Sequence, residues 1–97
     1  MRTVGDEEII KRIKRILSKI EEPTTGLDLI TGDYIKEIKI DFTRIEIRLR
    51  NIYIDYFSPS YLILKSYILN SLAKKIVDTL NKEGFTEVIV IGGREEF

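Results

Sequence analysis

The segment S-P-S-Y-L-I-L-K-S-Y-I-L-N-S-L-A-K-K-I-V-D-T-L-N-K-E-G, residues 58–84, decides the fold because it carries the signals of one long helix. Ser58 can accept a hydrogen bond from a free backbone N–H of the first turn, and Pro59 suits the first helical position. Gly84 suits the left-handed backbone just past a helix end. Between these signals, apolar residues recur at helical spacing: Leu64, Ile68, Leu69, Leu72, Ile76 and Leu80.

A second, amphipathic helix is predicted over residues 6–22. Asp6 can cap its N-terminus, and Pro23 cannot continue it. One side carries the apolar stripe Ile9, Ile10, Ile13, Ile16, Leu17 and Ile20, and the other side is basic. We interpret the basic side as a solvated surface, although it could also meet an acidic partner.

Alternating residues predict a β-hairpin between the two helices. Residues 34–42 and 45–50 alternate apolar with charged side chains, with a turn at 41–44, and residues 85–91 form a third strand rich in Val and Ile. The order α-β-β-α-β predicts one two-layer α/β domain over residues 1–97. It should have a small mixed three-stranded sheet, the third strand parallel to the second, and both helices on one face.

Composition limits the chemistry that this chain can perform. The 97 residues carry a net charge of +0 and contain neither Cys nor His. Thiolate nucleophiles, thiolate or imidazole metal ligands and an imidazole base are therefore excluded. No apolar run approaches the ~20 residues of a membrane span, and no secretory signal opens the chain, so we expect a cytoplasmic protein. Abundant Ile, Lys and Glu hint at a thermophilic source.

The connector between the first helix and the hairpin carries a motif. Residues 22–30 read E-P-T-T-G-L-D-L-I, which is the pattern acidic-Pro-x-x-Gly-x-Asp-apolar-apolar. With the element order, the strand I-K-I-D at 38–41 and the segment G-F-T-E-V-I-V at 84–90, this motif resembles the iron–sulfur cluster assembly (FSCA) domain family. That family comprises the PaaD- and SufT-like metal–sulfur cluster biosynthesis proteins. The resemblance covers nearly the whole chain.

The resemblance implies an FSCA-like scaffold without the family's reactive residue. The family places a Cys before a Pro at the start of its second helix, where the helix N-terminus favours the thiolate. The matching residue here is Ser58 before Pro59, and a hydroxyl is a poor ligand for soft metals. The family's Leu-Gly-Leu-type turn and Trp-containing tail also have no counterpart. The resemblance marks a family-motif pocket formed by Glu22, Gly26, Asp28 and Ser58.

Each candidate residue also has a structural interpretation. Ser58 can be a plain N-cap, and Asp28 can cap a turn of the connector instead of binding a hard cation. Arg48 and Arg50 lie on one strand face and could receive an anion or nucleic acid with help from Tyr56, or they could pair with acids across the sheet. The aromatic cluster of Tyr53, Tyr56, Phe57 and Tyr61 can be a hydrophobic plug or a subunit interface.

These patterns lead to two hypotheses of function. The first is a cysteine-less relative of FSCA domains, with no enzymatic activity and no cofactor, that acts as a protein-binding adaptor in iron–sulfur or metallocofactor maturation. Its partners would be cluster-assembly or cluster-receiving proteins. The second is a small anion- or nucleic-acid-binding module using Arg48 and Arg50, although the balanced charge argues against nucleic acid as the partner. The apolar third strand also predicts a homodimer.

Overall fold

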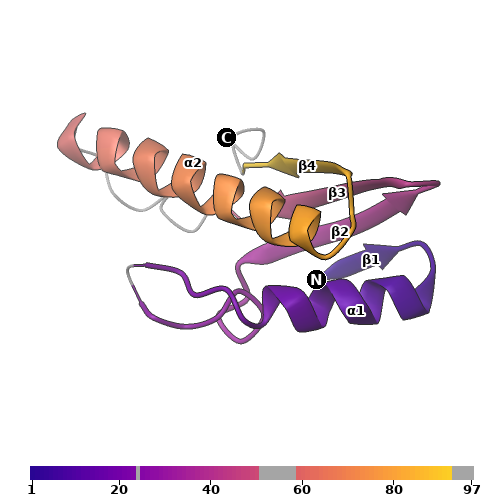
Figure 1. The fold of residues 1–97 in the computed structure, drawn as a ribbon. Coiled ribbons are helices and arrows are strands. Elements are labelled where there is room, and N and C mark those ends of the chain that lie inside the picture. Colours follow the sequence, from indigo (N-terminus) through magenta and orange to yellow (C-terminus); the bar gives the residue numbers. More distant parts are fainter. Residues whose placement is uncertain (24, 51–58, 93–97) are drawn as a thin grey trace.

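The computed structural model describes residues 1–23, 25–50 and 59–92, and within the long helix it describes side chains from Leu69 onward. The two helices lie together on one face of a mixed sheet with strand order β1-β2-β3-β4 (Figure 1). The two-layer α/β architecture is thus confirmed. The elements are β1 (Arg2–Val4), α1 (Glu7–Leu17), β2 (Ile35–Asp41), β3 (Arg44–Leu49), α2 (Pro59–Lys82) and β4 (Glu87–Ile91).

The expected three-stranded sheet is wrong, because the described residues form four strands. The additional strand β1 pairs in parallel with β2, placing Thr3 beside Ile38. All three residues of β1 are exposed, so the strand has no alternating apolar pattern by which the sequence could reveal it. The other pairings are as expected, with β2 antiparallel to β3 and β3 parallel to β4. Each helix therefore connects two neighbouring parallel strands.

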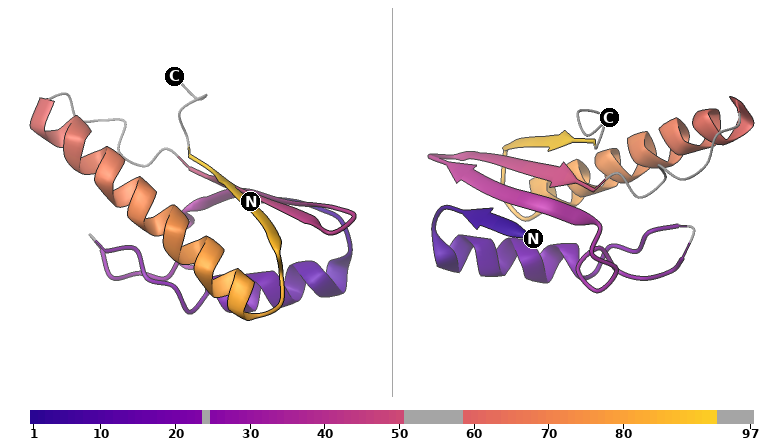
Figure 2. Two further views of the ribbon diagram at one scale, coloured as in Figure 1. Left: turned by 45° about the horizontal axis from the view of Figure 1, so that its top comes forward. Right: turned by 180° about the vertical axis from the view of Figure 1, so that it is seen from behind.

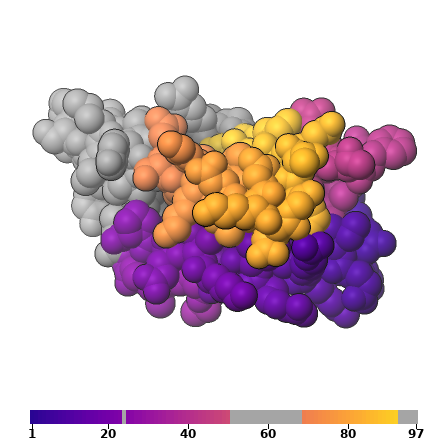
Figure 3. Space-filling model, in the orientation of Figure 1, coloured from indigo at the N-terminus to yellow at the C-terminus, as the bar shows by residue number. Residues whose placement is uncertain are grey.

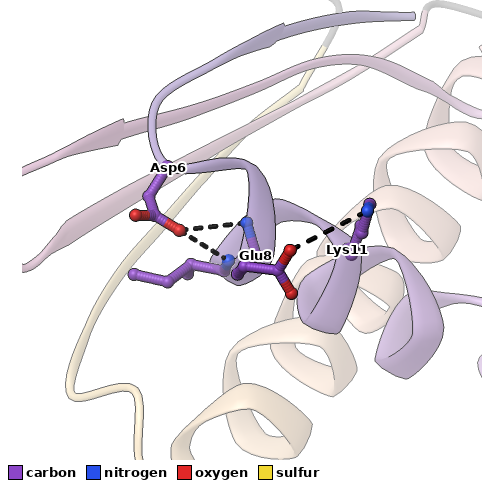
Figure 4. A network of polar contacts seen from close by, with 4 residues as sticks. Asp6, Glu8 and Lys11 are labelled. Atoms are coloured by element: carbon purple, nitrogen blue, oxygen red, sulfur yellow. Dashed lines mark hydrogen bonds and ion pairs between the residues drawn. The ribbon is translucent and has the colours of Figure 1, made fainter.

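Helix α1 begins where the sequence predicts and ends earlier. One carboxylate oxygen of Asp6 accepts from the backbone N–H groups of Glu8 and Ile9, and the Glu8 carboxylate lies 3.8 Å from the Lys11 ammonium (Figure 4). The helix ends at Leu17 and not near residue 22, because the chain beyond it turns to pair with a later part of the connector. Ile9, expected in the apolar stripe, is 37% exposed.

Helix α2 begins and ends where the sequence predicts. It starts at Pro59, and past its C-terminus Gly84 has a φ of +99° while the Phe85 N–H donates to the Leu80 carbonyl at 3.0 Å. Its 24 residues run along much of a molecule that measures 41 × 24 × 22 Å, and its first turns extend past the sheet (Figure 2). Among the described residues, neither helix combines the length and apolar character needed to cross a bilayer.

The core lies between the helices and one face of the sheet. The two central strands alternate as predicted, so that one face carries isoleucines and the other carries charges. A β-bulge between Ile35 and Glu37 allows Ile35 and Ile38, three positions apart, both to be buried. The fully buried side chains at the centre include Ile13, Leu17, Ile38, Ile47, Ile76 and Leu80.

Candidate functional site

The connector that carries the family motif is a closed loop with its own backbone hydrogen bonds. The Leu29 N–H donates to the Ile20 carbonyl at 3.0 Å, and the Glu22 N–H donates to the Leu27 carbonyl at 2.8 Å. Gly26 takes a φ of +74°, which a glycine adopts without steric cost. Of the connector's apolar residues, Leu29 is fully buried in the core and Ile30 packs against the core, whereas the Leu27 side chain is 47% exposed.

Glu22 is the buried centre of this loop, with 0% of its surface exposed. Its carboxylate accepts from the Thr25 backbone N–H at 2.9 Å and from the Thr25 hydroxyl at 3.0 Å. The Thr25 hydroxyl also lies 2.6 Å from the Tyr34 hydroxyl. Because a hydroxyl has one proton to give, Tyr34 is the donor in that second hydrogen bond. The chain Tyr34–Thr25–Glu22 therefore ties the connector to the start of β2.

Asp28 caps the turn that follows the motif. One carboxylate oxygen accepts from the backbone N–H groups of Ile30 at 3.1 Å and Thr31 at 3.0 Å. A hydrogen bond from the Thr31 side chain, followed by those from the backbone N–H groups of Thr31 and Ile30, lowers the pKa of the Asp28 carboxyl below its ordinary value because these bonds favour the charged form. The contacts match the structural interpretation of Asp28, a turn cap within the connector.

The lowered pKa of Asp28 predicts how stability changes with pH. A carboxyl whose pKa falls on folding contributes stability above its unfolded pKa, about 3.9, and loses it as the pH falls through the folded pKa. Asp28→Asn should therefore be less stable than wild type at neutral pH, and the difference should shrink on acidification. Urea unfolding of both proteins from about pH 7 to about pH 2 measures it. A difference that is independent of pH would contradict the assignment.

The structure thus brings three of the four family-motif residues, Glu22, Gly26 and Asp28, into one loop, where residues of the same connector donate hydrogen bonds to both carboxylates. Ser58, the fourth, lies outside the described residues, as do Tyr53, Tyr56 and Phe57; the Tyr61 side chain is also not described. Within the described ranges, no three acidic side chains gather closely enough to hold a metal ion.

The second candidate site, the outer face of β2 and β3, carries opposite charges in register. Across the two strands, Glu37 faces Arg48, Lys39 faces Glu46 and Asp41 faces Arg44. Opposite charges directly across an antiparallel pair stabilise it, which matches the structural interpretation of Arg48. Arg2 of β1 joins this surface, with its Nε 3.6 Å from a Glu37 carboxylate oxygen.

Arg50 lies just beyond the end of β3, and its own contacts hold it in place. Its backbone N–H donates to the Tyr34 carbonyl at 2.9 Å, and its Nε lies 3.4 Å from a carboxylate oxygen of Asp33. The Nε is buried without a well-formed hydrogen bond, so the Asp33 contact acts by charge attraction. Arg50 is therefore engaged by an acid at the edge of the outer face.

Two surface hollows were not predicted from the sequence. One, of about 330 Å³, is lined by Arg2, Lys36, Glu37 and Arg48, three cationic groups and one carboxylate. This hollow could not be predicted from the sequence, because Arg2 belongs to the unpredicted strand β1 and Lys36 to the unpredicted bulge. The other, of about 250 Å³, lies at the turn between β2 and β3 and is mainly apolar.

Comparison with known proteins does not place the chain in a family: no protein-family model matches it, and no curated protein matches it significantly. The resemblance to FSCA domains therefore rests on the sequence alone, namely the motif at residues 22–30, the segments at 38–41 and 84–90 and the predicted order of elements.

Proposed function

We propose that this chain is a non-catalytic protein-binding adaptor, a cysteine-less relative of the FSCA domains, that acts in iron–sulfur or metallocofactor maturation. The observation that carries the proposal is the connector, whose Glu22, Gly26 and Asp28 each have a defined place in one closed loop. The absence of Cys and His supports the non-catalytic part.

The order of elements is the second support. After α1, the chain forms an antiparallel hairpin, and α2 then returns it to a strand parallel to β3. This is the arrangement predicted from the order of the elements, with β1 added at one edge of the sheet. An adaptor needs a binding surface and not a reactive residue, and the outer face of the sheet is such a surface.

Affinity purification from the native organism tests the adaptor role. Tagged protein should enrich cluster-assembly or cluster-receiving proteins when the bound fraction is identified by mass spectrometry. Reconstitution with iron and sulfide should leave the purified chain without a stable cluster, judged by absorbance after desalting. A stable cluster on the chain would overturn the non-catalytic part. Recovery of no maturation protein would overturn the adaptor part.

A second candidate function is the binding of an anion or nucleic acid at the outer face. The observation that favours it is the hollow lined by Arg2, Lys36 and Arg48, in which Glu37 is the single acidic group. The opposite-charge register and the Asp33 contact of Arg50 reduce the charge offered to a ligand, so this function has less support. It predicts a shift of single-stranded nucleic acid at low salt, lost in Arg48→Glu and weakened in Arg50→Glu. The lack of a shift at low salt would remove it.

We also propose that the chain forms a homodimer. The homodimer is predicted from the apolar character of the last strand. In the described sheet this strand, β4, lies at one edge. Val88 and Val90 pack against the core, while Ile89 and Ile91 are half-buried on the opposite face. Apolar side chains thus lie on both faces of an edge strand, which favours an additional contact. Sedimentation equilibrium at high micromolar concentration measures the oligomeric state, and a monomer there would contradict the proposal.

A further inference from the structure

The turn between β2 and β3 contains a phenylalanine, Phe42, that does not stabilise the single chain. The Phe42 side chain is 96% exposed, the most exposed large apolar residue among those described. Its φ is +57°, a left-handed conformation that is an outlier for a bulky residue and is therefore strained. Asn or Gly would avoid both the strain and the exposed ring. Neither packing nor turn chemistry within one molecule therefore explains Phe42.

An apolar hollow lies directly beside this ring. Ile9, Ile40, Ile45 and Phe85 form most of its walls, and Phe42 itself forms part of the rim. Its volume of about 250 Å³ is sufficient for a phenyl ring, since a cavity of about 150 Å³ can hold benzene. In the space-filling view, the turn projects from the body of the molecule (Figure 3). The exposed Phe42 ring and a hollow large enough for a phenyl ring thus lie side by side on one surface of the molecule.

The far wall of the hollow is held in place by Arg12. Its guanidinium lies 4.9 Å from the centre of the Phe85 ring, within range of a cation–π contact. It also donates to the Glu83 carbonyl at 2.8 Å and lies 3.7 Å from the Glu83 carboxylate. These contacts connect α1 to the segment after α2 and fix Phe85. The hollow is therefore formed before any partner arrives, which lowers the cost of binding.

We propose that the occupant of this hollow is a second copy of the chain, with Phe42 of each copy entering the hollow of the other. A two-fold contact requires one surface patch to be complementary to itself, and a ring next to a ring-sized hollow meets that requirement. Because Phe42 also lines its own hollow, a ring that enters the hollow from the other copy would lie next to it. The net charge of +0 imposes no overall repulsion between copies.

The inference rests on the homodimer proposed above and assigns its contact to the hairpin turn instead of β4. Two phenylalanine side chains bury roughly 300–500 Å² together, well under the ~1,200 Å² at the low end of stable interfaces. The walls of the two hollows add to this area without making the contact large. The dimer is therefore weak, with an expected dissociation constant of roughly tens to hundreds of micromolar.

Sedimentation equilibrium of the full chain between about 10 μM and about 1 mM tests the contact. Wild type should pass from monomer to dimer over this range. Phe42→Asn removes the ring while suiting the positive φ, so it should fold and dimerise at least about tenfold more weakly. Ile9→Lys, on a wall of the hollow, should weaken the dimer as well. Leu27→Asn removes another exposed apolar side chain, away from the hollow, and should change nothing.

The outcomes separate this inference from the broader proposals. A dimer that persists in Phe42→Asn and is lost in Ile89→Lys would overturn the contact while keeping the homodimer, with β4 as its interface. A wild type that is monomeric throughout would overturn both contact and homodimer, and would leave the adaptor role to the purification experiment. A loss of dimer equal in Leu27→Asn and Phe42→Asn would indicate non-specific association and would also overturn the contact.

A chemical cross-link gives an independent measurement. The chain has no cysteine, so Thr43→Cys creates a single thiol next to Phe42 while leaving the ring in place. A short bis-maleimide should link two copies through this thiol. Ser71→Cys, on the exposed side of α2, should remain unlinked at the same concentration. Linking of the Ser71 variant without the Thr43 variant would contradict the assignment.

Discussion

Gly5→Ala should destabilise the protein by about 3 kcal/mol. Gly5 joins β1 to α1 with a φ of +130°, a conformation that side chains adopt at a cost of about 1–3 kcal/mol. A Cβ built there would lie 2.8 Å from the Cβ of Ile40, and crowding of this kind costs about 1–3 kcal/mol more. Thermal unfolding should show a midpoint lower by more than ~10 °C, given about 4–8 °C per kcal/mol in a domain of this size.

Two other glycines give matched controls. Gly26 and Gly84 also have positive φ values, but a Cβ at either meets no atom within 4 Å. Alanine there pays only the backbone term, about 1 kcal/mol, part of which is offset by the restriction of the unfolded chain. The order of destabilisation should therefore place Gly5→Ala well above the other two. Equal effects at all three positions would show that the contact with Ile40 does not matter.

Glu22→Ala should destabilise the protein by about 3 kcal/mol, because it removes a fully buried acceptor of two hydrogen bonds and leaves a cavity in its place. The Thr25 backbone N–H and hydroxyl both lose their partner, and the Tyr34 hydroxyl loses the end of its hydrogen-bond chain. Chemical denaturation followed by circular dichroism measures the free energy of unfolding. A change below about 0.5 kcal/mol, typical of a surface position, would contradict the buried role.

Glu22→Gln is the matched control for this prediction. The amide keeps one oxygen that can accept from Thr25 and loses the charge, so its cost should be clearly smaller than that of Glu22→Ala. Tyr34→Phe removes only the far end of the chain and should cost about 1 kcal/mol. If Glu22→Gln were as damaging as Glu22→Ala, the charge and not the acceptor would be the essential feature.

The parts of the fold that the sequence predicts well are those with local signals. Helix α2 starts at Pro59 and is followed by a left-handed Gly84, because these residues act through their own backbone geometry. The hairpin follows from alternation in β2 and β3. Strand β1 could not be predicted, since its three exposed residues gain their conformation only from pairing with β2. The early end of α1 likewise depends on a partner further along the chain.

The candidate sites likewise include features with a local sequence signal and features that depend on distant parts of the chain. Asp28 could be interpreted as a turn cap, because its contacts are with residues two and three positions ahead. Glu22 is fully buried and is linked through Thr25 to Tyr34, a residue further along the chain, so its burial does not follow from a local pattern. The exposure of Phe42 likewise has no local signal in the sequence. The hollow at the turn joins segments more than thirty residues apart, such as Ile9, Phe42 and Phe85. Only a three-dimensional arrangement could reveal it.

The strand order has a consequence for how the chain acquires its structure. Of the three strand pairings, only β2 with β3 is local in sequence, closed by a two-residue turn at 42–43. Hairpins form in about 1–10 μs, whereas each parallel pairing waits for a helix to span the strands it connects. The sheet should thus be assembled from its centre outward, with β1 and β4 added as α1 and α2 dock. Phe42, with its left-handed backbone, lies in the turn that closes this first hairpin.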